Sequence, residues 1–489
     1  MRKISVIFAL VAAFFLSGCA TMKTPSKPGD VWTPPKWEKA SKKPDTYWKE
    51  IRERKSIPGP VGLGEIVEAA LENNPSTSKA IATARAAQAK VKQSESTWYP
   101  QVTVEADVTR YRRTDEYDVN EMNQLYATPQ GSLTMLLFDF GGRAARVKEA
   151  MNNLVAANFS YNQTVLDVIL TAQKAYYSYY SAMAQLDASE DDVNDSKTTY
   201  YAADQKYRAG IVTMLDVLQS KSTFENALYT REQRRGDLKT AQGTLAQSMG
   251  LSADTSMRIE IPGARTPPDV TKQNIKQVID YALEKRPDIA SQRASVNAKA
   301  SALAAANSDL FPTLNLGGSL DSNYYDYYGV QQNEAALDKY NSAFTGFVNV
   351  KWNIFDGFYN YSKRNEAKAL LKAQEETLLK AEIDASSDVW NKFYSYKTSV
   401  SKLTSSEALF KSSKKSYELA KESYDAGLKN IIDLLKSQSD LSAARSKLIS
   451  SRVDVFTSLA DLAHAVGLMS TSVEENSIPK NDQAESTRP

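Results

Sequence analysis

The stretch "YRAGIVTMLDVLQS" at 207–220 has a second version, "YDAGLKNIIDLLKS", at 424–437, and the predicted fold rests on this repeated turn. Its glycines, Gly210 and Gly427, stand 217 residues apart, each within a long part of the chain that contains no proline. Glycine takes the left-handed backbone conformation that ends a helix at little cost. The sequence therefore predicts two long helices joined by a tight turn, and it predicts this hairpin twice.

The repetition extends beyond the two turns. "ALENNP" (70–75) matches "ALEKRP" (282–287), and "TWYPQVTVE" (97–105) matches "DLFPTLNLG" (309–317), both at an offset of 212 residues. From Phe138 onward the two copies stay in step at an offset of 217. An internal repeat of this kind indicates two structural copies of one unit.

Each copy is expected to hold short helices, a β-hairpin and a long helical hairpin. The expected boundaries are first repeat 63–262 (β-hairpin about 100–140, helical hairpin about 142–250), linker 263–273, and second repeat 274–468 (β-hairpin about 312–356, helical hairpin about 358–467). An outgoing helix of roughly 65 residues is about 100 Å long and needs a partner helix beside it. Apolar residues of the first returning helix, among them Leu215, Leu218 and Leu245, are expected to pack against it.

Two stretches of each repeat alternate between apolar and polar residues. The apolar positions are Val102, Val104, Ala106 and Val108 in the first repeat, and Leu314, Leu316, Leu320, Val348, Val350, Trp352 and Ile354 in the second. A period of two over about ten residues, with aromatic residues at the ends, is typical of the strands of a membrane β-barrel. The alternative is a soluble amphipathic sheet.

Four such strands cannot close a barrel by themselves. Open edges leave backbone N–H and C=O groups unpaired, and lipid offers these groups no hydrogen-bond partner. We therefore expect a mixed α and β membrane protein in which three copies share one 12-stranded β-barrel, with four strands per chain. Each copy would also contribute its helices to a long α-helical coiled-coil barrel that continues from the β-barrel.

The N-terminus has the sequence of an export signal. In "MRKISVIFALVAAFFLSGCA" (1–20), Arg2 and Lys3 precede an apolar run too short to remain as a membrane-spanning helix. The run ends in Leu-Ser-Gly-Cys, which resembles the bacterial lipobox. That resemblance implies removal of a signal peptide at 1–18 and lipidation of Cys19, and the alternative is an ordinary signal with an incidental cysteine. Cys19 is the only cysteine of the chain, so no internal disulfide forms.

The segments on either side of the repeats have a different composition. Residues 19–62 are rich in Pro, Lys and Trp and are expected to form an extended, lipidated strap. Residues 469–489 are polar and are expected to be disordered. The residue after Cys19 is Ala20 rather than an acidic residue, which by resemblance to the lipoproteins of Gram-negative bacteria indicates the outer membrane.

Composition and motifs argue against an enzyme and against nucleic-acid binding. The formal net charge is only +2, so the chain lacks the basic excess of a nucleic-acid-binding protein. There is one histidine, His464, and the sequence contains no metal-ligand spacing, nucleophile motif or paired catalytic carboxylates. We therefore expect no enzymatic activity, no cofactor, no bound metal and no nucleic-acid partner.

The ordered motifs, present twice over about 63–468, resemble those of the TolC-like outer-membrane efflux family, specifically its lipidated branch. They are "YP" or "FP" before the strands, "FDFGG" and "FDGF" after them, and the paired tips. The resemblance implies a homotrimeric, passive duct that is lipid-anchored in the outer membrane of a Gram-negative bacterium and extends into the periplasm. It would be the exit duct of a tripartite efflux or type I secretion system, with a periplasmic adaptor (membrane fusion protein), an inner-membrane transporter reached through that adaptor, and outer-membrane lipid as partners. The alternative is a non-channel structural lipoprotein that spans the periplasm.

The second tip carries the candidate gate residues. The resemblance places Tyr424 and Lys429 at positions whose hydrogen bonds and ion pairs hold the second coil shut. It places Asp433 at the closed periplasmic entrance, where three copies would form a ring of carboxylates. Where some members have a second acidic residue, this chain has Lys436, which argues against strong cation selectivity. The alternative is that these are solvated tip residues and that Asp433 is a helix-capping residue.

Local chemistry assigns simpler roles to the other tip residues. Thr213 and Asn430 are expected to cap the returning helices, with Asp216 and Asp433 three residues later as in a capping box. The tips also carry small and apolar residues that are expected to dock the adaptor: Ala209, Gly210, Ile211, Val212, Ala426, Gly427 and Leu428. Isolated exposed apolar residues are common on proteins, so the docking hypothesis depends on their repetition.

Overall fold

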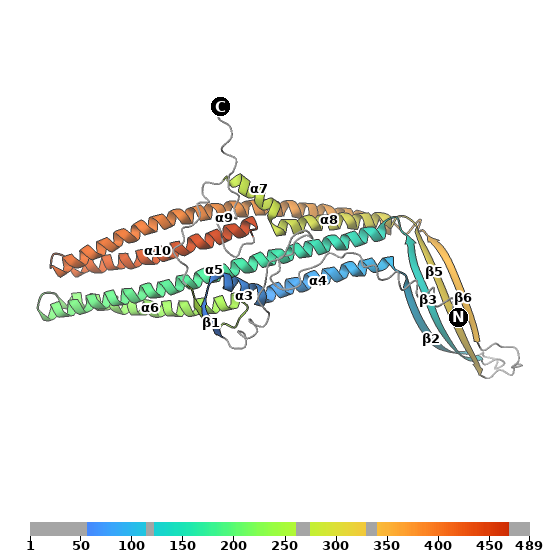
Figure 1. Ribbon diagram of the computed structural model, residues 1–489, viewed down its shortest axis with the longest axis horizontal. Helices are drawn as coiled ribbons and strands as arrows, with labels where there is room; N and C mark the ends of the chain where they lie inside the picture. Colours follow the sequence, from blue (N-terminus) through green and yellow to red (C-terminus); the bar gives the residue numbers. More distant parts are fainter. Residues whose placement is uncertain (1–55, 114–121, 261–273, 329–339, 469–489) are drawn as a thin grey trace, which may run out of the picture. The chain divides into compact units, whose positions relative to one another are not determined.

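The computed structural model describes residues 56–113, 122–260, 274–328 and 340–468 (Figure 1). The expected signal peptide (1–18), Cys19, most of the strap, the linker (263–273) and the tail (469–489) lie outside the described residues. The chain divides into two compact units, Met1–Ala84 with Ala157–Ser291 and Leu379–Pro489, and Arg85–Ala156 with Gln292–Leu378. Within the described ranges, no helix is both long enough and apolar enough to cross a membrane.

Two long helical hairpins follow the repeated turns. α5 (Gly142–Arg208) and α9 (Tyr359–Asp425) have 67 residues each. Figure 1 shows α6 (Met214–Ser248) running back beside α5, and α10 (Ile431–Val466) running back beside α9. Both turn glycines take the left-handed conformation that the sequence predicts, with φ of 73° and 72°.

The buried side of α6 differs from the one that the apolar spacing predicts. Leu215 and Leu218 are 62% and 53% exposed in the single chain, whereas Val217 and Ser220 are buried. Leu245, near the end of the helix, is fully buried as expected. The expectation for Leu215 and Leu218 was therefore wrong for one chain alone, because the spacing of leucines marks a stripe but does not say which side of the helix has a neighbour.

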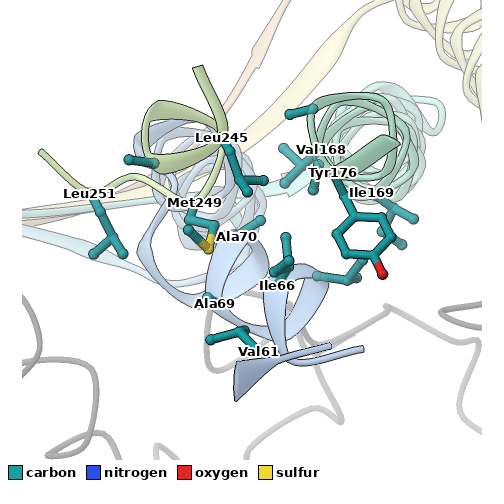
Figure 2. Packing of buried hydrophobic residues seen from close by; sticks show 14 of the residues in the cluster. Val61, Ile66, Ala69, Ala70, Val168, Ile169, Tyr176, Leu245, Met249 and Leu251 are labelled. Carbon is teal, nitrogen blue, oxygen red and sulfur yellow. The ribbon is translucent and has the colours of Figure 1, made fainter. Parts of the chain in front are cut away.

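A hydrophobic core joins the short helix α3 (Leu63–Asn73) to the first hairpin. Figure 2 shows side chains of α3, α5 and α6 gathered around Ile66 and Leu245, and both residues are fully buried. The Tyr176 ring packs in the same cluster, and its hydroxyl donates a hydrogen bond to the Glu260 carbonyl at 2.9 Å. Burying one aliphatic side chain of this size contributes roughly 1.5–3 kcal/mol, so this core anchors α3 firmly on the hairpin.

The second repeat builds a matching core. Val278 of α7 (Ile275–Lys285) and Leu462 of α10 are buried together with side chains of α9. By the repeat offsets these two residues are the counterparts of Ile66 and Leu245 of the first core. The two repeats therefore share their packing as well as their order of elements.

A glycine closes each core at the end of the returning helix. Gly250 has φ of 72°, and a Cβ added there would lie 2.5 Å from the Asn73 carbonyl oxygen. Gly467 has φ of 82°, and its Cβ would lie 3.1 Å from the Cα of Arg286. The next helices, α4 (Pro75–Glu95) and α8 (Pro287–Ser308), begin just beyond these contacts. The repeated "GL" of the sequence thus marks a close backbone approach.

A two-stranded parallel sheet was not predicted from the sequence. β1 (Ser56–Val61), at the end of the expected strap, pairs with β4 (Ser256–Ile259), which follows α6. Both strands are too short for their alternation to be recognised, and their pairing joins segments about 200 residues apart, which no local pattern reveals.

The larger sheet has four antiparallel strands in the order β2-β3-β5-β6 (Figure 1). They are β2 (Gln101–Arg113), β3 (Met122–Phe138), β5 (Thr313–Tyr328) and β6 (Tyr340–Lys351). The hairpin of each repeat supplies two neighbouring strands, and β3 and β5 pair where the repeats meet. The two hairpins of one chain therefore form one continuous four-stranded sheet.

The second hairpin ends earlier than predicted. Its expected boundary was about residue 356, but β6 ends at Lys351, so Trp352 and Ile354 lie beyond the strand. Lys351 is the partner of Thr313, which directly follows Pro312. Proline has no backbone N–H, so β5 offers β6 no regular ladder beyond this pair.

Candidate functional site

One face of the four-stranded sheet is apolar. Residues directly opposite each other in antiparallel strands share a face, and the register places Val104 opposite Gly131, Gly131 opposite Leu320, and Leu320 opposite Phe344. Val104 and Phe344 are each 81% exposed. The same face carries Val102, Val108, Leu133, Leu316, Val348 and Val350. An exposed apolar surface of this extent marks an interaction with lipid or with another apolar surface.

The opposite face is mostly polar, although Ala343 and Phe347 of β6 also lie on it. Thr103, Ser132, Ser319 and Thr345 lie side by side across all four strands. Glu105, Gln130 and Asp321 form the next level, and Lys351 lies at the end of β6. A sheet with one apolar and one polar face is suited to separate lipid from water.

Both outer strands of this sheet have an open edge. In the part of the chain that the structure describes, β2 pairs only with β3, and β6 pairs only with β5. Every residue of 101–110 and of 341–351 is exposed. An exposed edge strand of this length is a template for pairing with another strand.

The passage from strand to helix is held by an aspartate in each repeat. The Asp139 carboxylate accepts a hydrogen bond from the Arg143 backbone N–H at 2.6 Å, and Asp356 accepts from the Asn360 N–H at 3.1 Å. The buried Arg143 guanidinium also donates to the carbonyl oxygens at the end of β3, of which Leu136 is 2.6 Å away. Sequence reasoning did not single out Arg143, since its counterpart in the second repeat is an asparagine.

The two helical tips share one backbone turn. At the first tip the Ile211 N–H donates to the Lys206 carbonyl at 2.9 Å, and at the second the Leu428 N–H donates to the Ser423 carbonyl at 2.8 Å. This six-residue hydrogen bond around a left-handed glycine is the Schellman arrangement. Ile211 and Leu428 are 71% and 81% exposed, so each turn presents an apolar side chain to its surroundings.

The other predicted docking residues lie on the same two turns. Ala209, Gly210, Ala426 and Gly427 are exposed, whereas Val212 is half-buried. On the first tip, exposed Met214 and Leu215 of α6 extend the apolar surface. The docking hypothesis omitted both residues. Their exposure in the structure, and not their residue type, identifies them as part of this apolar surface.

At the first tip Thr213 and Asp216 form a reciprocal capping box. Thr213 caps α6, and its side chain accepts from the Asp216 N–H at 3.4 Å. The Asp216 carboxylate in turn accepts from the Thr213 N–H and hydroxyl, both at 2.8 Å. This closed capping box fixes the start of the returning helix.

At the second tip the cap is simpler. The Asn430 side chain accepts from the Asp433 N–H at 3.0 Å, and Asn430 is the N-cap of α10. The Asp433 carboxylate lies 3.7 Å from the Lys429 ammonium, and both side chains are about half exposed. Lys436 forms its ion pair with Asp440, one turn along the same helix. Of the four predicted gate residues, only Lys429 and Asp433 are therefore brought into contact with each other.

Tyr424 is held by a residue that sequence reasoning missed. The Lys206 ammonium lies 3.8 Å from the centre of the Tyr424 ring and donates to the Tyr424 carbonyl at 2.8 Å. Tyr424 is only 4% exposed, and its hydroxyl has no hydrogen-bond partner. Burial, with the nearby Asp216 and Asp425 carboxylates, raises the pKa of Tyr424. Lys206 belongs to the first repeat, so this contact links the ends of the two outgoing helices.

The single histidine also links the two repeats. His464 Nε2 of α10 lies 2.7 Å from the Asp167 carboxylate of α5. Burial opposes ionisation of Asp167, but hydrogen bonds from His464 and Gln163 hold its pKa below the usual value. Among the described residues, no three His, Cys, Asp or Glu side chains are grouped so that they can hold a metal ion.

Comparison with known sequences identifies the family. The sequence profile of the outer membrane efflux protein family matches residues 66–251 and 278–468, that is, both repeats. This chain belongs to that family. The predicted family and outer-membrane location are thereby confirmed, and the function is that of an outer-membrane efflux protein.

Individual relatives are distant in sequence. Protein CyaE of Bordetella pertussis is 25% identical over 324 residues, which is 66% of each chain. Outer membrane protein OprJ of Pseudomonas aeruginosa is 22% identical over 372 residues, 74% of each chain. The crystal structure of the Campylobacter jejuni outer membrane channel CmeC superposes with a TM-score of 0.71 at 18% identity, covering 94% of this chain and 97% of that one. This last similarity shows that the fold is shared.

Proposed function

We propose that three copies of this chain form a passive exit duct through the outer membrane, as part of a tripartite efflux or type I secretion system. The observation that carries the proposal is the four-stranded sheet with one apolar face, one polar face and two open edges. Three such sheets provide twelve strands, which lies within the range of membrane β-barrels. The apolar faces would contact lipid and the polar faces would line the lumen.

The second tip is the proposed gate. Lys206 holds Tyr424 in place, and Lys429 partly neutralises Asp433. A ring of three Asp433 carboxylates, each with a lysine beside it, would attract cations less strongly than free carboxylates. Lys436 adds a further positive charge on the same helix. Transport energy would come from the inner-membrane transporter, and the duct would open by separation of the second tips.

The first tip is the proposed docking surface for the periplasmic adaptor. Its exposed apolar residues Ile211, Met214 and Leu215 lie around a rigid, fully capped turn. A rigid surface loses little conformational freedom on binding, which favours docking. Lipidation at Cys19 would add an anchor in the outer membrane.

The competing hypothesis is a structural lipoprotein without a pore, and conductance measurements separate the two. Purified full-length protein in planar bilayers should give stepwise ion conductance. Thr103→Cys and Val104→Cys place thiols on opposite faces of one strand, so a charged thiol reagent should reduce conductance in the first variant and not in the second. Absence of conductance, or equal block in both variants, would contradict the duct.

A gate variant tests the second tip in the same recordings. Lys429→Ala with Asp433→Ala should raise the open probability of the channel. The matched control, Lys436→Ala with Asp440→Ala, removes an ion pair that lies one turn further along α10 and should leave it unchanged. An unchanged open probability in the first variant would show that the gate residues are wrong.

A further inference from the structure

We propose that Phe347 forms a contact site for aromatic cations inside the barrel, near the end of the barrel that leads to the helices. In three chains, three such rings would lie at one level of the lumen. The inference rests on the proposed function, since it requires that the mostly polar face of the sheet lines a duct. It adds a residue that contacts the transported molecules, and it names the chemical class of those molecules.

Strand register places Phe347 on the mostly polar face of the sheet. Phe347 lies opposite Gly317 of β5, and Gly317 lies opposite Thr134 of β3. Thr134 is also the partner of Gln101 in β2, so these four residues form one level across the sheet. β6 ends at Lys351, four residues beyond Phe347, which is about 14 Å along a strand. The ring therefore lies close to the end of the barrel from which the helices continue.

Gly317 provides the space in which the Phe347 ring rests. A Cβ added at Gly317 would lie 2.3 Å from the Cζ atom of this ring and 2.8 Å from both of its Cε atoms. Any other residue at position 317 would therefore displace the ring. A glycine inside a strand often marks a close approach of this kind. The wall of the sheet thus supports the tip of the ring.

The supported ring keeps an accessible surface. Phe347 is 48% exposed although its tip lies over Gly317. Apolar surface in contact with water is unfavourable, and contact with an apolar molecule removes part of that cost. A single exposed apolar residue is common on proteins, so exposure alone does not mark a site.

The ring and its glycine are specific to the second repeat. By the repeat offsets, Gly317 corresponds to Glu105 and Phe347 corresponds to Gln130. Glu105 and Gln130 are partners in the first hairpin, as Gly317 and Phe347 are in the second. The first hairpin therefore builds the same pair of strands with two polar side chains. Because strand pairing requires neither the ring nor the glycine, their presence points to a role other than sheet formation.

Charges on the same face favour cations. From the level of Asp107 to the end of β6, the described residues of this face carry one cation, Lys351, and three carboxylates, those of Glu105, Asp107 and Asp321. Asp321 is the partner of Ala343, four positions from Phe347 along β6. An aromatic ring attracts a cation placed over its face, and it also stacks on other aromatic rings. An aromatic cation combines both interactions with the attraction of the carboxylates.

Ethidium, a fluorescent aromatic cation, tests the site on the full-length protein in a mild non-ionic detergent. Its fluorescence anisotropy measures binding, and we expect Phe347→Ala to raise the dissociation constant about 2- to 5-fold, as for the loss of one exposed contact between a cation and a ring. Phe347→Leu keeps an apolar side chain without the ring and should lose affinity to a similar extent. Phe347→Trp restores a ring and should bind as tightly as the wild type.

The matched control is Phe344→Ala. Phe344 lies three positions away on the same strand, but on the apolar face. Its removal should leave the dissociation constant unchanged, which separates binding inside the barrel from adsorption to the detergent-covered surface. Fluorescein, an aromatic anion, should bind at least 10-fold more weakly than ethidium. Equal binding of the two probes would overturn the preference for cations.

The outcomes separate this inference from the proposed function. Native mass spectrometry of each variant shows whether trimers form. If trimers form and Phe347→Ala or Phe347→Leu binds ethidium as tightly as the wild type, the contact site is wrong while the duct stands. The same holds if Phe344→Ala weakens binding as much as Phe347→Ala does. If the wild-type protein forms no trimer, the proposed duct fails and the inference fails with it.

Discussion

The two tips of the molecule have the same backbone turn and very different surroundings. Each turn is closed by a left-handed glycine and by the same hydrogen bonds. At the first tip Met214 is 50% exposed, whereas its counterpart at the second tip, Ile431, is 2% exposed. Ile431 belongs to a buried cluster with Tyr417, Tyr424, Leu434 and Leu441.

This difference shows that one repeated turn can have two different surroundings. The turn depends on glycine and backbone hydrogen bonds, so it is reproduced wherever its sequence is reproduced. The surroundings depend on a few side chains that differ between the copies. The first tip exposes Met214, whereas the second tip buries the equivalent Ile431 and is held by Lys206 from the first repeat, although Leu428 stays exposed there. The following variants test whether the two repeats share their backbone turns and core packing but differ in the side-chain contacts around each tip.

The largest effect is expected at the glycines that close the two cores. Gly250→Ala should destabilise the protein by about 3 kcal/mol or more, because it adds a left-handed strain of about 1–2 kcal/mol to a clash with backbone atoms. Gly467→Ala should cost about 1–2 kcal/mol, since its closest contact is longer. Thermal unfolding of the solubilised protein measures both.

The control for these variants is Gly236→Ala, in the interior of α6, where an added Cβ meets nothing within 4 Å. It should stabilise the protein by roughly 0.5–1 kcal/mol through helix propensity. Equal effects of Gly250→Ala and Gly236→Ala would show that the close approach of Gly250 to the Asn73 backbone does not contribute to stability.

The next largest effect should be confined to the second tip. Lys206→Met removes the cation over the Tyr424 ring and a hydrogen bond to a carbonyl, and it should lower local stability by about 1–2 kcal/mol. Hydrogen exchange of 417–441 should accelerate, with that of 213–220 unchanged. Arg208→Met, which removes only an exposed ion pair with Asp204, is the matched control.

Tyr424→Phe tests whether the ring or the hydroxyl of Tyr424 holds the second tip. The hydroxyl has no hydrogen-bond partner, so its removal should change stability by less than about 0.5 kcal/mol. A loss as large as that of Lys206→Met would mean that the hydroxyl, and not the ring, is the contact that holds this tip.

The two aspartates of the tips should respond differently. Asp216→Asn removes the negative charge from the acceptor of two short hydrogen bonds in a capping box and should cost about 1 kcal/mol. Asp433→Asn removes only an exposed partner of Lys429 and should cost less than about 0.5 kcal/mol. Chemical denaturation of the two variants would contradict this assignment if the costs were reversed.

The smallest effect is a dependence on alkaline pH. The pKa of Tyr424 is raised above its ordinary value of 10.0, first by burial and then by Asp216 and Asp425. Its neutral form therefore contributes stability that is fully present below pH 10 and is lost as the pH rises through the raised pKa. Hydrogen exchange, corrected for its intrinsic pH dependence, should show alkaline loosening of the second tip. The Tyr424→Phe variant should show less of it, and an equal response would contradict the burial of this phenol.

Patterns that repeat over many residues allowed prediction of most of the fold. Helix boundaries follow the absence of proline and the positions of Gly210 and Gly427, and the strands of the larger sheet follow a period of two. The parallel pair β1 and β4 could not be predicted, because it depends on contact between distant segments with little local pattern.

The candidate site was less predictable than the fold. Thr213 and Asn430 act within three residues, so their capping geometry can be read from local sequence. The contact between Lys206 and Tyr424 joins different repeats, and exposed lysines are too common in helices for one of them to stand out. The exposure of Leu215 depends on the side of α6 against which a neighbouring helix packs. The spacing of the leucines does not reveal that side.

We propose that one chain supplies only part of a closed barrel, because β2 and β6 each keep an open edge among the residues that the structure describes. The most direct measurement is the mass of the full-length protein solubilised in mild detergent, determined by native mass spectrometry. We expect a complex of three chains. A monomer that retains its β-sheet and remains stable alone would contradict the claim.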